Sequence, residues 1–147
     1  MGQKIEIQYW DQVAATYETE WYLERIWYWG DWIEKRVILN RVNPQQDDVI
    51  LEAGCGTGRL TRLLARKSKK VYAIDFSPRS IEVLNKKTRQ EGIQNVQSLM
   101  CDITQPLPLS EAVDKALSCQ LIQHIPTECG RQQALNNITT CCGRKAR

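Results

Sequence analysis

A short apolar segment that runs directly into a cluster of glycines constrains the fold of this chain more than any other feature. Residues 49–58 read Val-Ile-Leu-Glu-Ala-Gly-Cys-Gly-Thr-Gly. A short, mostly apolar run predicts a buried strand, and glycines after it allow a sharp turn and a close approach of the backbone to a ligand. The helix that follows would point its free amide groups at the same place. The segment predicts a nucleotide-binding turn or, alternatively, a tight strand–helix turn without a ligand.

Strand and helix patterns alternate along the rest of the chain. Beyond the strand at 49–53, the patterns predict strands at 71–74, 96–100 and 113–118 and helices at 59–67, 77–91 and from 126 onward. Strands that are joined through helices pair in parallel, and helices cover the faces of their sheet. We therefore predict an α/β fold with a Rossmann-like doubly wound sheet, mainly parallel and preceded by N-terminal helices.

Residues 3–42 have a helical pattern and a high aromatic content. All five tryptophans and four of the five tyrosines lie between residues 9 and 32. Asn43-Pro44 ends this region, because a residue before proline avoids the helical conformation. We interpret residues 1–44 as a helical lid segment and residues 45–147 as the binding domain. Most of the aromatic side chains are expected to pack on the sheet, with Tyr17 and Trp21 near the site.

Composition and charge argue against several classes of protein. The 147 residues suffice for one domain, and 20 basic against 17 acidic residues leave a net charge of +3, which is too small to indicate a nucleic-acid or membrane partner. No apolar run approaches the roughly 20 residues of a membrane span. The six cysteines form no Cys-x-x-Cys pair and there is one histidine, so we predict no metal site. The polar first residues do not resemble a signal peptide, and we expect a cytoplasmic protein with reduced thiols.

Two aspartates follow the second and third predicted strands. Asp75 ends the second strand, 21 residues after Gly54, and Asp102 comes just after the third. In sheets of this kind the carboxyl ends of the strands border the ligand crevice. A carboxylate at Asp75 can accept hydrogen bonds from a ribose diol. Asp102 can accept one from the adenine amine, with Ile103 packing on the ring. The alternative for each aspartate is a loop acid or, for Asp75, a helix cap.

Together these features resemble the class I S-adenosylmethionine-dependent methyltransferases, in their small-molecule branch. The resemblance covers about residues 8–142 and rests on the order and spacing of motifs that are individually loose. The matching segments are Tyr9–Tyr17, the glycine motif Glu52–Gly58, the acidic strand end Ala73–Ser77, the triplet Cys101–Ile103 and Gln123–Pro126. The resemblance implies S-adenosylmethionine as cofactor and a small molecule as the methyl acceptor.

The resemblance also assigns roles to individual residues. Asp75 would hold the ribose hydroxyls, with Phe76 and Ser77 beside it. Asp102 would hold the adenine amine, with Ile103 on the ring. The residues assigned to the methionine part are Gly54, Cys55, Gly56 and Gly58 in the turn, Glu52 or Tyr17 at the head group, and Cys119 and Gln120 near the sulfonium.

His124 is the candidate catalytic base, because it is the only histidine and follows the fourth strand. A base helps only when the acceptor must lose a proton, and a packing or capping role fits His124 equally.

Amino-methylating DNA enzymes resemble one another in an Asn/Asp-Pro-Pro-Tyr/Phe segment after the fourth strand, whereas residues 118–121 of this chain read Ser-Cys-Gln-Leu. We therefore expect no nucleic-acid partner and no membrane partner.

Two further alternatives concern the ligand and the completeness of the sheet. A dinucleotide site would have glycine at the sixth place of the turn, where this chain has Arg59. The resembled family has seven strands, of which about four are predicted here. We therefore expect a chain that is truncated after the fourth strand, whose exposed edge would allow self-association. It would then be an active enzyme, a non-catalytic cofactor-binding remnant, or a subunit completed by a partner.

Overall fold

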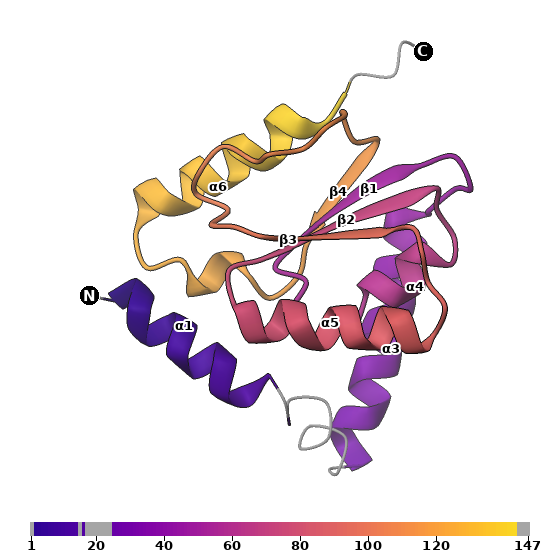
Figure 1. The fold of residues 1–147 in the computed structure, drawn as a ribbon, viewed down its shortest axis with the longest axis horizontal. Coiled ribbons are helices and arrows are strands. Elements are labelled where there is room, and N and C mark those ends of the chain that lie inside the picture. Colours follow the sequence, from indigo (N-terminus) through magenta and orange to yellow (C-terminus); the bar gives the residue numbers. More distant parts are fainter. Residues whose placement is uncertain (1, 15, 17–24, 144–147) are drawn as a thin grey trace.

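A four-stranded parallel sheet forms the centre of the computed structural model, which describes residues 2–14, 16 and 25–143. The strands are β1 (Val49–Ala53), β2 (Lys70–Asp75), β3 (Val96–Met100) and β4 (Lys115–Ser118). They lie in the order β3-β2-β1-β4, and each neighbouring pair is parallel (Figure 1). The α/β fold predicted from the sequence is confirmed.

Helices cover both faces of the sheet (Figure 1). The helical elements are α1 (Gly2–Val13), α3 (Arg25–Val42), α4 (Thr61–Ala65), α5 (Pro78–Gln90), α6 (Glu128–Cys141) and a 3₁₀ turn, η1 (Ile122–His124). Successive strand residues point to opposite faces, so Ile50 and Val71 pack with α3 and α4, whereas Leu51 and Tyr72 pack on the side of α6. This double coverage explains why β1 is buried along its whole length.

The strand register brings three loops to one edge of the sheet. Ala53 at the end of β1 pairs with Ile74 of β2 on one side and with Ser118 of β4 on the other. The segments that follow these strands therefore emerge side by side at the carboxyl edge. These segments are the glycine turn, residues 75–77 and residues 119–124, and they provide most of the candidate site described below.

The helix α5 begins and ends as its sequence predicts. The Ser77 side chain accepts a hydrogen bond from the Ser80 amide, and Pro78 occupies the first helical position. Gly92, with φ of +66°, follows the last residues of the helix.

Other boundaries differ from the sequence-based expectations. β4 begins at Lys115 rather than at residue 113, because Asp114 is held by β1: its carboxylate accepts a hydrogen bond from the Val49 amide at 2.8 Å. Val113 instead forms an isolated parallel bridge with Cys142. Helix α4 covers only residues 61–65 of the predicted 59–67. α6 begins at residue 128 rather than 126, because Thr127 caps it by accepting from the Gly130 amide.

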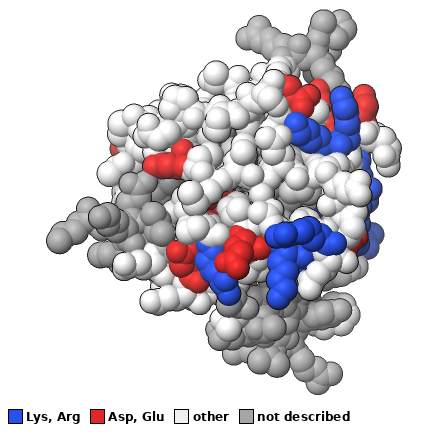
Figure 2. Space-filling model, viewed as in Figure 1, with Lys and Arg blue, Asp and Glu red and all other residues white. Residues whose placement is uncertain are grey.

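Charged side chains of both signs are mixed on the surface. On the face shown in Figure 2, basic and acidic side chains lie next to one another. Among the described residues, ion pairs at the surface include Arg66 with Glu91 at 2.6 Å and Lys70 with Glu111 at 3.0 Å. Exposed pairs of this kind contribute little to stability.

Three observations bear on the broader class of the protein. Within residues 2–14, 16 and 25–143, no helix is long and apolar enough to cross a membrane. The same described residues contain no group of three or more side chains arranged to hold a metal ion. All six cysteines are free thiols.

Candidate functional site

The turn after β1 is fixed to the end of β2 by its backbone. The amides of Gly54 and Cys55 both donate to the Ile74 carbonyl, at 2.8 and 2.9 Å. The turn therefore has one defined conformation in which its next residue, Gly56, reaches the Asp75 side chain. The Gly56 amide donates to Asp75 Oδ2 at 2.8 Å.

The three glycines of the turn serve different physical purposes. A Cβ on Gly58 would lie 2.4 Å from the Leu84 side chain of α5, so Gly58 allows α5 to pack closely. A Cβ on Gly54 would lie 2.8 Å from Leu121. A Cβ on Gly56 would meet nothing within 4 Å, so this residue presents open backbone to the adjoining cavity. Gly54 and Gly56 line that cavity; the ligand contact assigned to Gly58 stays a prediction.

Asp75 is the most highly organised carboxylate of the site. It is 8% exposed, and its two oxygens accept from the amides of Gly56 and Ser77 at 2.8 and 2.9 Å. Burial raises the pKa of Asp75, while these backbone hydrogen bonds act in the opposite direction. Ser77 itself is fully buried as the cap of α5, and it also contacts the Asp11 carboxylate of α1.

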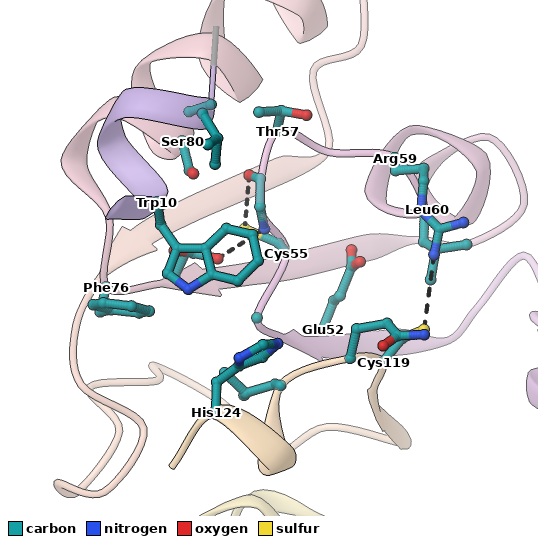
Figure 3. A pocket seen from close by; sticks show the side chains of 17 residues that line it. Trp10, Glu52, Cys55, Thr57, Arg59, Leu60, Phe76, Ser80, Cys119 and His124 are labelled. Atoms are coloured by element: carbon teal, nitrogen blue, oxygen red, sulfur yellow. Dashed lines mark hydrogen bonds between the residues drawn. The ribbon is translucent and has the colours of Figure 1, made fainter. Parts of the chain in front are cut away.

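Two adjoining cavities lie along the carboxyl edge of the sheet. One has a volume of about 110 Å³ and is shown in Figure 3; the other has a volume of about 340 Å³. The residues that line both are Gly54, Asp75, Phe76, Leu121 and His124. Because these residues line both cavities, we consider the two adjoining cavities together as one site, which we call the strand-end crevice.

The larger cavity contains the residues that were assigned to adenine. Asp102 and Ile103 both line it, together with Asp75 and Phe76. Asp102 Oδ1 accepts from the Thr104 amide at 2.9 Å and from its hydroxyl at 2.8 Å, which fixes the orientation of the carboxylate. Ile103 is 6% exposed and belongs to the core next to α6. The expected convergence of the two strand-end aspartates on one crevice is therefore observed.

Glu52 is a buried acid in the smaller cavity. It is 2% exposed, and the Thr61 hydroxyl donates to its Oε2 at 2.6 Å. Burial raises the pKa of Glu52 to about 8, although the Thr61 hydrogen bond and the charge of Arg59 lower it. Glu52 is therefore largely protonated near neutral pH until a cation lies beside it.

Arg59 connects the glycine turn to α3. Its Nη1 lies 2.7 Å from Asp31 and 2.6 Å from Glu34. Its Nη2 lies 3.8 Å from the Cys119 sulfur. Cys119 and Gln120 line the same cavity, and both contact Glu34 at 3.5 Å.

In the sequence, Arg59 was notable only as the residue that replaces the last glycine of the dinucleotide pattern. Burial works against the charge of Arg59, but its hydrogen bonds to the two carboxylates raise its pKa. The guanidinium therefore stays charged. Burial also raises the pKa of Cys119, to about 11, so its thiol stays protonated.

The first helix lies across the crevice and contacts both walls. Trp10 of α1 packs edge to face on His124, with ring centroids 5.1 Å apart. The neighbouring Asp11 accepts from the Arg79 amide at 3.2 Å at the start of α5. Trp10, Val13 and Ala14 line the smaller cavity, a role that helical spacing alone did not assign to them. Tyr17 and Trp21, which were expected near the site, lie outside the described residues.

The residues present fit an adenosyl amino acid. Such a cofactor has an adenine, a ribose diol, a charged sulfur and an amino-acid head. Carboxylates at Asp102 and Asp75 suit the first two, and the open backbone of Gly56 leaves room for the thioether chain. In the smaller cavity Arg59 offers a positive charge, and Glu52 offers a carboxyl group that ionises when a cation lies beside it.

This combination of parallel sheet, glycine turn and strand-end carboxylates defines a cofactor-binding α/β domain of the class I methyltransferase type. Comparison with known families agrees. The chain belongs to the family described as methyltransferase domain, whose model matches residues 50–144. The cofactor of this family is S-adenosylmethionine. The membership decides against the dinucleotide alternative.

Curated relatives include enzymes named for different acceptors. An uncharacterized RNA methyltransferase of Clostridium tetani is 28% identical over 107 residues, which are 70% of this chain and 23% of that protein. A ubiquinone biosynthesis O-methyltransferase of Methylocella silvestris is 32% identical over 98 residues, 67% of this chain and 35% of that protein. The chain thus spans about a third or less of the length of these relatives.

Solved structures share the fold. Phosphoethanolamine N-methyltransferase 1 of Haemonchus contortus, in complex with phosphoethanolamine and S-adenosylhomocysteine, has a TM-score of 0.74 at 18% identity, covering 90% of this chain and 28% of its own. Coclaurine N-methyltransferase, bound to N-methylheliamine and S-adenosylhomocysteine, has a TM-score of 0.66 at 25% identity, covering 77% and 33%.

The comparisons correct one expectation from the sequence. Nucleic acid was excluded as a partner because of the small net charge and the segment 118–121. Several relatives are named RNA methyltransferases, including a ribosomal RNA small subunit methyltransferase of Methanosarcina acetivorans that is 35% identical over 71 residues. The exclusion was wrong because net charge and one local motif do not report on an acceptor that other parts of a protein recognise.

Proposed function

We propose that this chain forms the S-adenosylmethionine-binding part of an enzyme that transfers a methyl group to a small-molecule acceptor. The observation that carries the proposal is the Asp75 carboxylate, held by the amides of Gly56 and Ser77 in the wall of the strand-end crevice. With Asp102 in the same crevice, these groups complement a ribose and an adenine.

The position of the N-terminal helix α1 is evidence in favour of a small-molecule acceptor. α1 contacts both walls of the crevice through Trp10 and Asp11, so it narrows the approach to the smaller cavity. We propose that α1 is the lid, because α3 packs against the sheet. Two similar proteins, named for ubiquinone biosynthesis and for phosphoethanolamine, are small-molecule enzymes by name.

The proposed chemistry asks the protein mainly to position and shield the reactants. The bound cofactor would supply a methyl group on a positively charged sulfur, which is already activated for displacement. Trp10, Val13 and Ala14 would exclude water from the smaller cavity. The walls at Cys119 and Gln120 would orient the acceptor beside the cofactor. His124, which lines both cavities, would accept a proton from an acceptor that must lose one.

Calorimetry with S-adenosylhomocysteine tests the cofactor site. We expect the parent chain to bind, and Asp75→Ala to bind at least about 10-fold more weakly, because charge-assisted hydrogen bonds to the ribose would be lost. Glu82→Ala is the matched control, since that side chain is exposed on α5 and pairs with Arg79. Absence of binding by the parent chain would overturn the cofactor assignment.

Transfer of a labelled methyl group tests the acceptor. The chain is incubated with labelled S-adenosylmethionine and either RNA or a small-molecule extract from the same cells. Label in the small-molecule fraction is the expected result. Label in RNA would overturn the small-molecule proposal in favour of the acceptor named in several relatives. Cofactor binding without any transfer would instead favour a non-catalytic binding domain.

We also propose a cytoplasmic location. The six free thiols are consistent with a reducing compartment. Fractionation of cells that make the tagged protein would test the location.

A further inference from the structure

Arg59 occupies the end of the smaller cavity that lies farthest from Phe76. Figure 3 shows Trp10 and Phe76 on one side of this cavity, Arg59 with Cys119 on the other, and Glu52 between them. Among the described residues that line the cavity, Arg59 is the one lysine or arginine. The cation Arg59 and the buried acid Glu52 together suit a ligand group that has both a negative and a positive charge.

The amino-acid head of S-adenosylmethionine is such a group, with an ammonium and a carboxylate on one carbon. We propose that Arg59 binds the carboxylate of this head, and that Asp31 and Glu34 of α3 position its guanidinium. The inference rests on the proposed cofactor site and adds to it a residue that distinguishes amino-acid-bearing adenosyl ligands from those without the carboxylate.

The guanidinium retains donors for this purpose. An arginine side chain has five N–H groups in a rigid plane. Within the described part of the chain, the two on Nη1 face Asp31 and Glu34, and one on Nη2 faces the Cys119 sulfur. The Nε–H and the second Nη2–H have no hydrogen-bond partner there. Nε and Nη2 lie along one edge of the guanidinium, and an edge of this kind can pair with a carboxylate in two parallel hydrogen bonds.

Neighbouring charged side chains position the Arg59 guanidinium, and the cluster that they form with it is close to neutral overall. The Arg59 side chain is 21% exposed, so an unpaired charge there would be costly. Asp31 also pairs with Lys35 at 2.6 Å, so two cations and two carboxylates balance in this cluster. A ligand carboxylate would therefore meet a charged, positioned arginine in a nearly neutral environment.

Three ligands separate this role from a merely structural one. S-adenosylhomocysteine has the whole amino-acid head, its decarboxylated analogue has only the ammonium, and 5′-methylthioadenosine has neither. We expect Arg59→Gln to weaken S-adenosylhomocysteine binding by roughly 10- to 100-fold. The affinities of Arg59→Gln for the two ligands without a carboxylate should stay within about twofold of the affinities of the parent chain.

Further variants test the details of the assignment. Arg59→Lys should recover only part of the affinity, because an ammonium cannot make the paired contact. Glu34→Gln should show a smaller loss, confined to S-adenosylhomocysteine. Arg66→Gln is the matched control, because that side chain is 58% exposed and pairs with Glu91. It should bind all three ligands as the parent does.

The outcomes distinguish this proposal from the cofactor assignment. If the parent chain binds none of the three ligands, the cofactor site itself is wrong. If the parent binds but Arg59→Gln weakens all three ligands equally, Arg59 only supports the turn, and the carboxylate assignment is overturned. An unchanged affinity of Arg59→Gln for S-adenosylhomocysteine would overturn it as well.

Discussion

The indole of Trp10 and the imidazole of His124 meet edge to face, with ring centroids 5.1 Å apart and planes at 81°. Trp10 belongs to α1, whereas His124 ends the 3₁₀ turn after β4. The contact joins the proposed lid to the proposed base. Edge-to-face aromatic pairs add about 0.5–1.5 kcal/mol beyond the area that they bury.

Replacing His124 tests its role as a base. His124→Gln should lower the turnover number by about 100-fold or more for an acceptor that must lose a proton. Its affinity for S-adenosylhomocysteine should change by less than about threefold. Steady-state kinetics from pH 5 to 9 with calorimetry would measure both. Unchanged turnover and an unchanged pH profile would leave His124 with a packing role. Trp10→Leu, which keeps an apolar side chain, should retain the pH profile and lower turnover only modestly.

The contact of Asp11 with the start of α5 should hold the proposed lid closed, and it should therefore slow the dissociation of S-adenosylhomocysteine. The carboxylate contacts Ser77 and accepts from the Arg79 amide at the helix N-terminus, where a negative charge is favoured. Asp11→Ala should speed S-adenosylhomocysteine dissociation by about 3- to 10-fold, since such caps contribute about 1 kcal/mol. Stopped-flow fluorescence would measure the rate. Gln12→Ala, at an exposed neighbouring position, is the control, and equal rates in both variants would contradict the lid.

Two glycines of the same turn should respond differently to alanine. Gly58→Ala places a Cβ 2.4 Å from Leu84 at φ of +86°, so we expect a loss of about 2–4 kcal/mol in the free energy of unfolding. Gly56→Ala meets open space at φ of +51°, which should cost about 1–2 kcal/mol of stability. Its Cβ would project toward the cavity and lower S-adenosylhomocysteine affinity at least about 10-fold. Urea unfolding and calorimetry would separate the two effects. In a double-mutant cycle, Gly58→Ala should cost less stability in a Leu84→Ala background than in the parent, because the clash is then removed. An equal cost in both backgrounds would assign the loss to backbone strain.

The buried acid Glu52 predicts a dependence of stability on pH. Its pKa is about 8 in the folded chain against an ordinary value of 4.5, so between these pH values the folded state holds the extra proton. Stability is therefore greatest below pH 4.5 as far as Glu52 is concerned, and it is lost as pH rises through 8. Glu52→Gln should remove this loss, which is on the order of a few kcal/mol. Urea unfolding at pH 5.5 and pH 8.5 would measure it; an equal decline in both proteins would contradict the assignment.

Ligand binding should reveal the same proton. If the ammonium of the cofactor lies beside Glu52, binding at pH 7 should release up to about one proton, because a neighbouring cation favours the carboxylate. Calorimetry of S-adenosylhomocysteine in buffers with different ionisation enthalpies would count the protons. Glu52→Gln should release none, and equal release by the two proteins would place the ammonium elsewhere.

Local signals in the sequence predicted much of the framework. The bounds of β1 and β3 agree with the predicted 49–53 and 96–100, because each is a short run bounded by turn-forming residues. Ser77-Pro78 specified the start of α5 through capping, which acts over a few residues. The spacing from Gly54 to Asp75 and Asp102 predicted their convergence, because parallel strands end at one edge.

Residues distant in the sequence decided the rest. Nothing near Arg59 indicates its partners Asp31 and Glu34, which precede it by 28 and 25 positions and meet it only after α3 packs on the sheet. The meeting of Trp10 with His124 depends in the same way on how α1 lies across the crevice. Asp114, an acidic residue inside the predicted fourth strand, is explained by its hydrogen bond to Val49 on β1.

The glycine turn shows which features local sequence determines and which depend on the tertiary structure. The sequence by itself determined that residues 49–58 form a strand and a turn with open backbone, since glycine and apolar periodicity act locally. Only the tertiary structure decided that Gly56 faces the cavity while Gly58 faces Leu84, and that Glu52 is buried beside Arg59. The physical reason is that burial and contact depend on which elements pack together. The smaller cavity alone is lined from residues 10–14, 52–60, 75–80 and 119–124, which are far apart in the sequence.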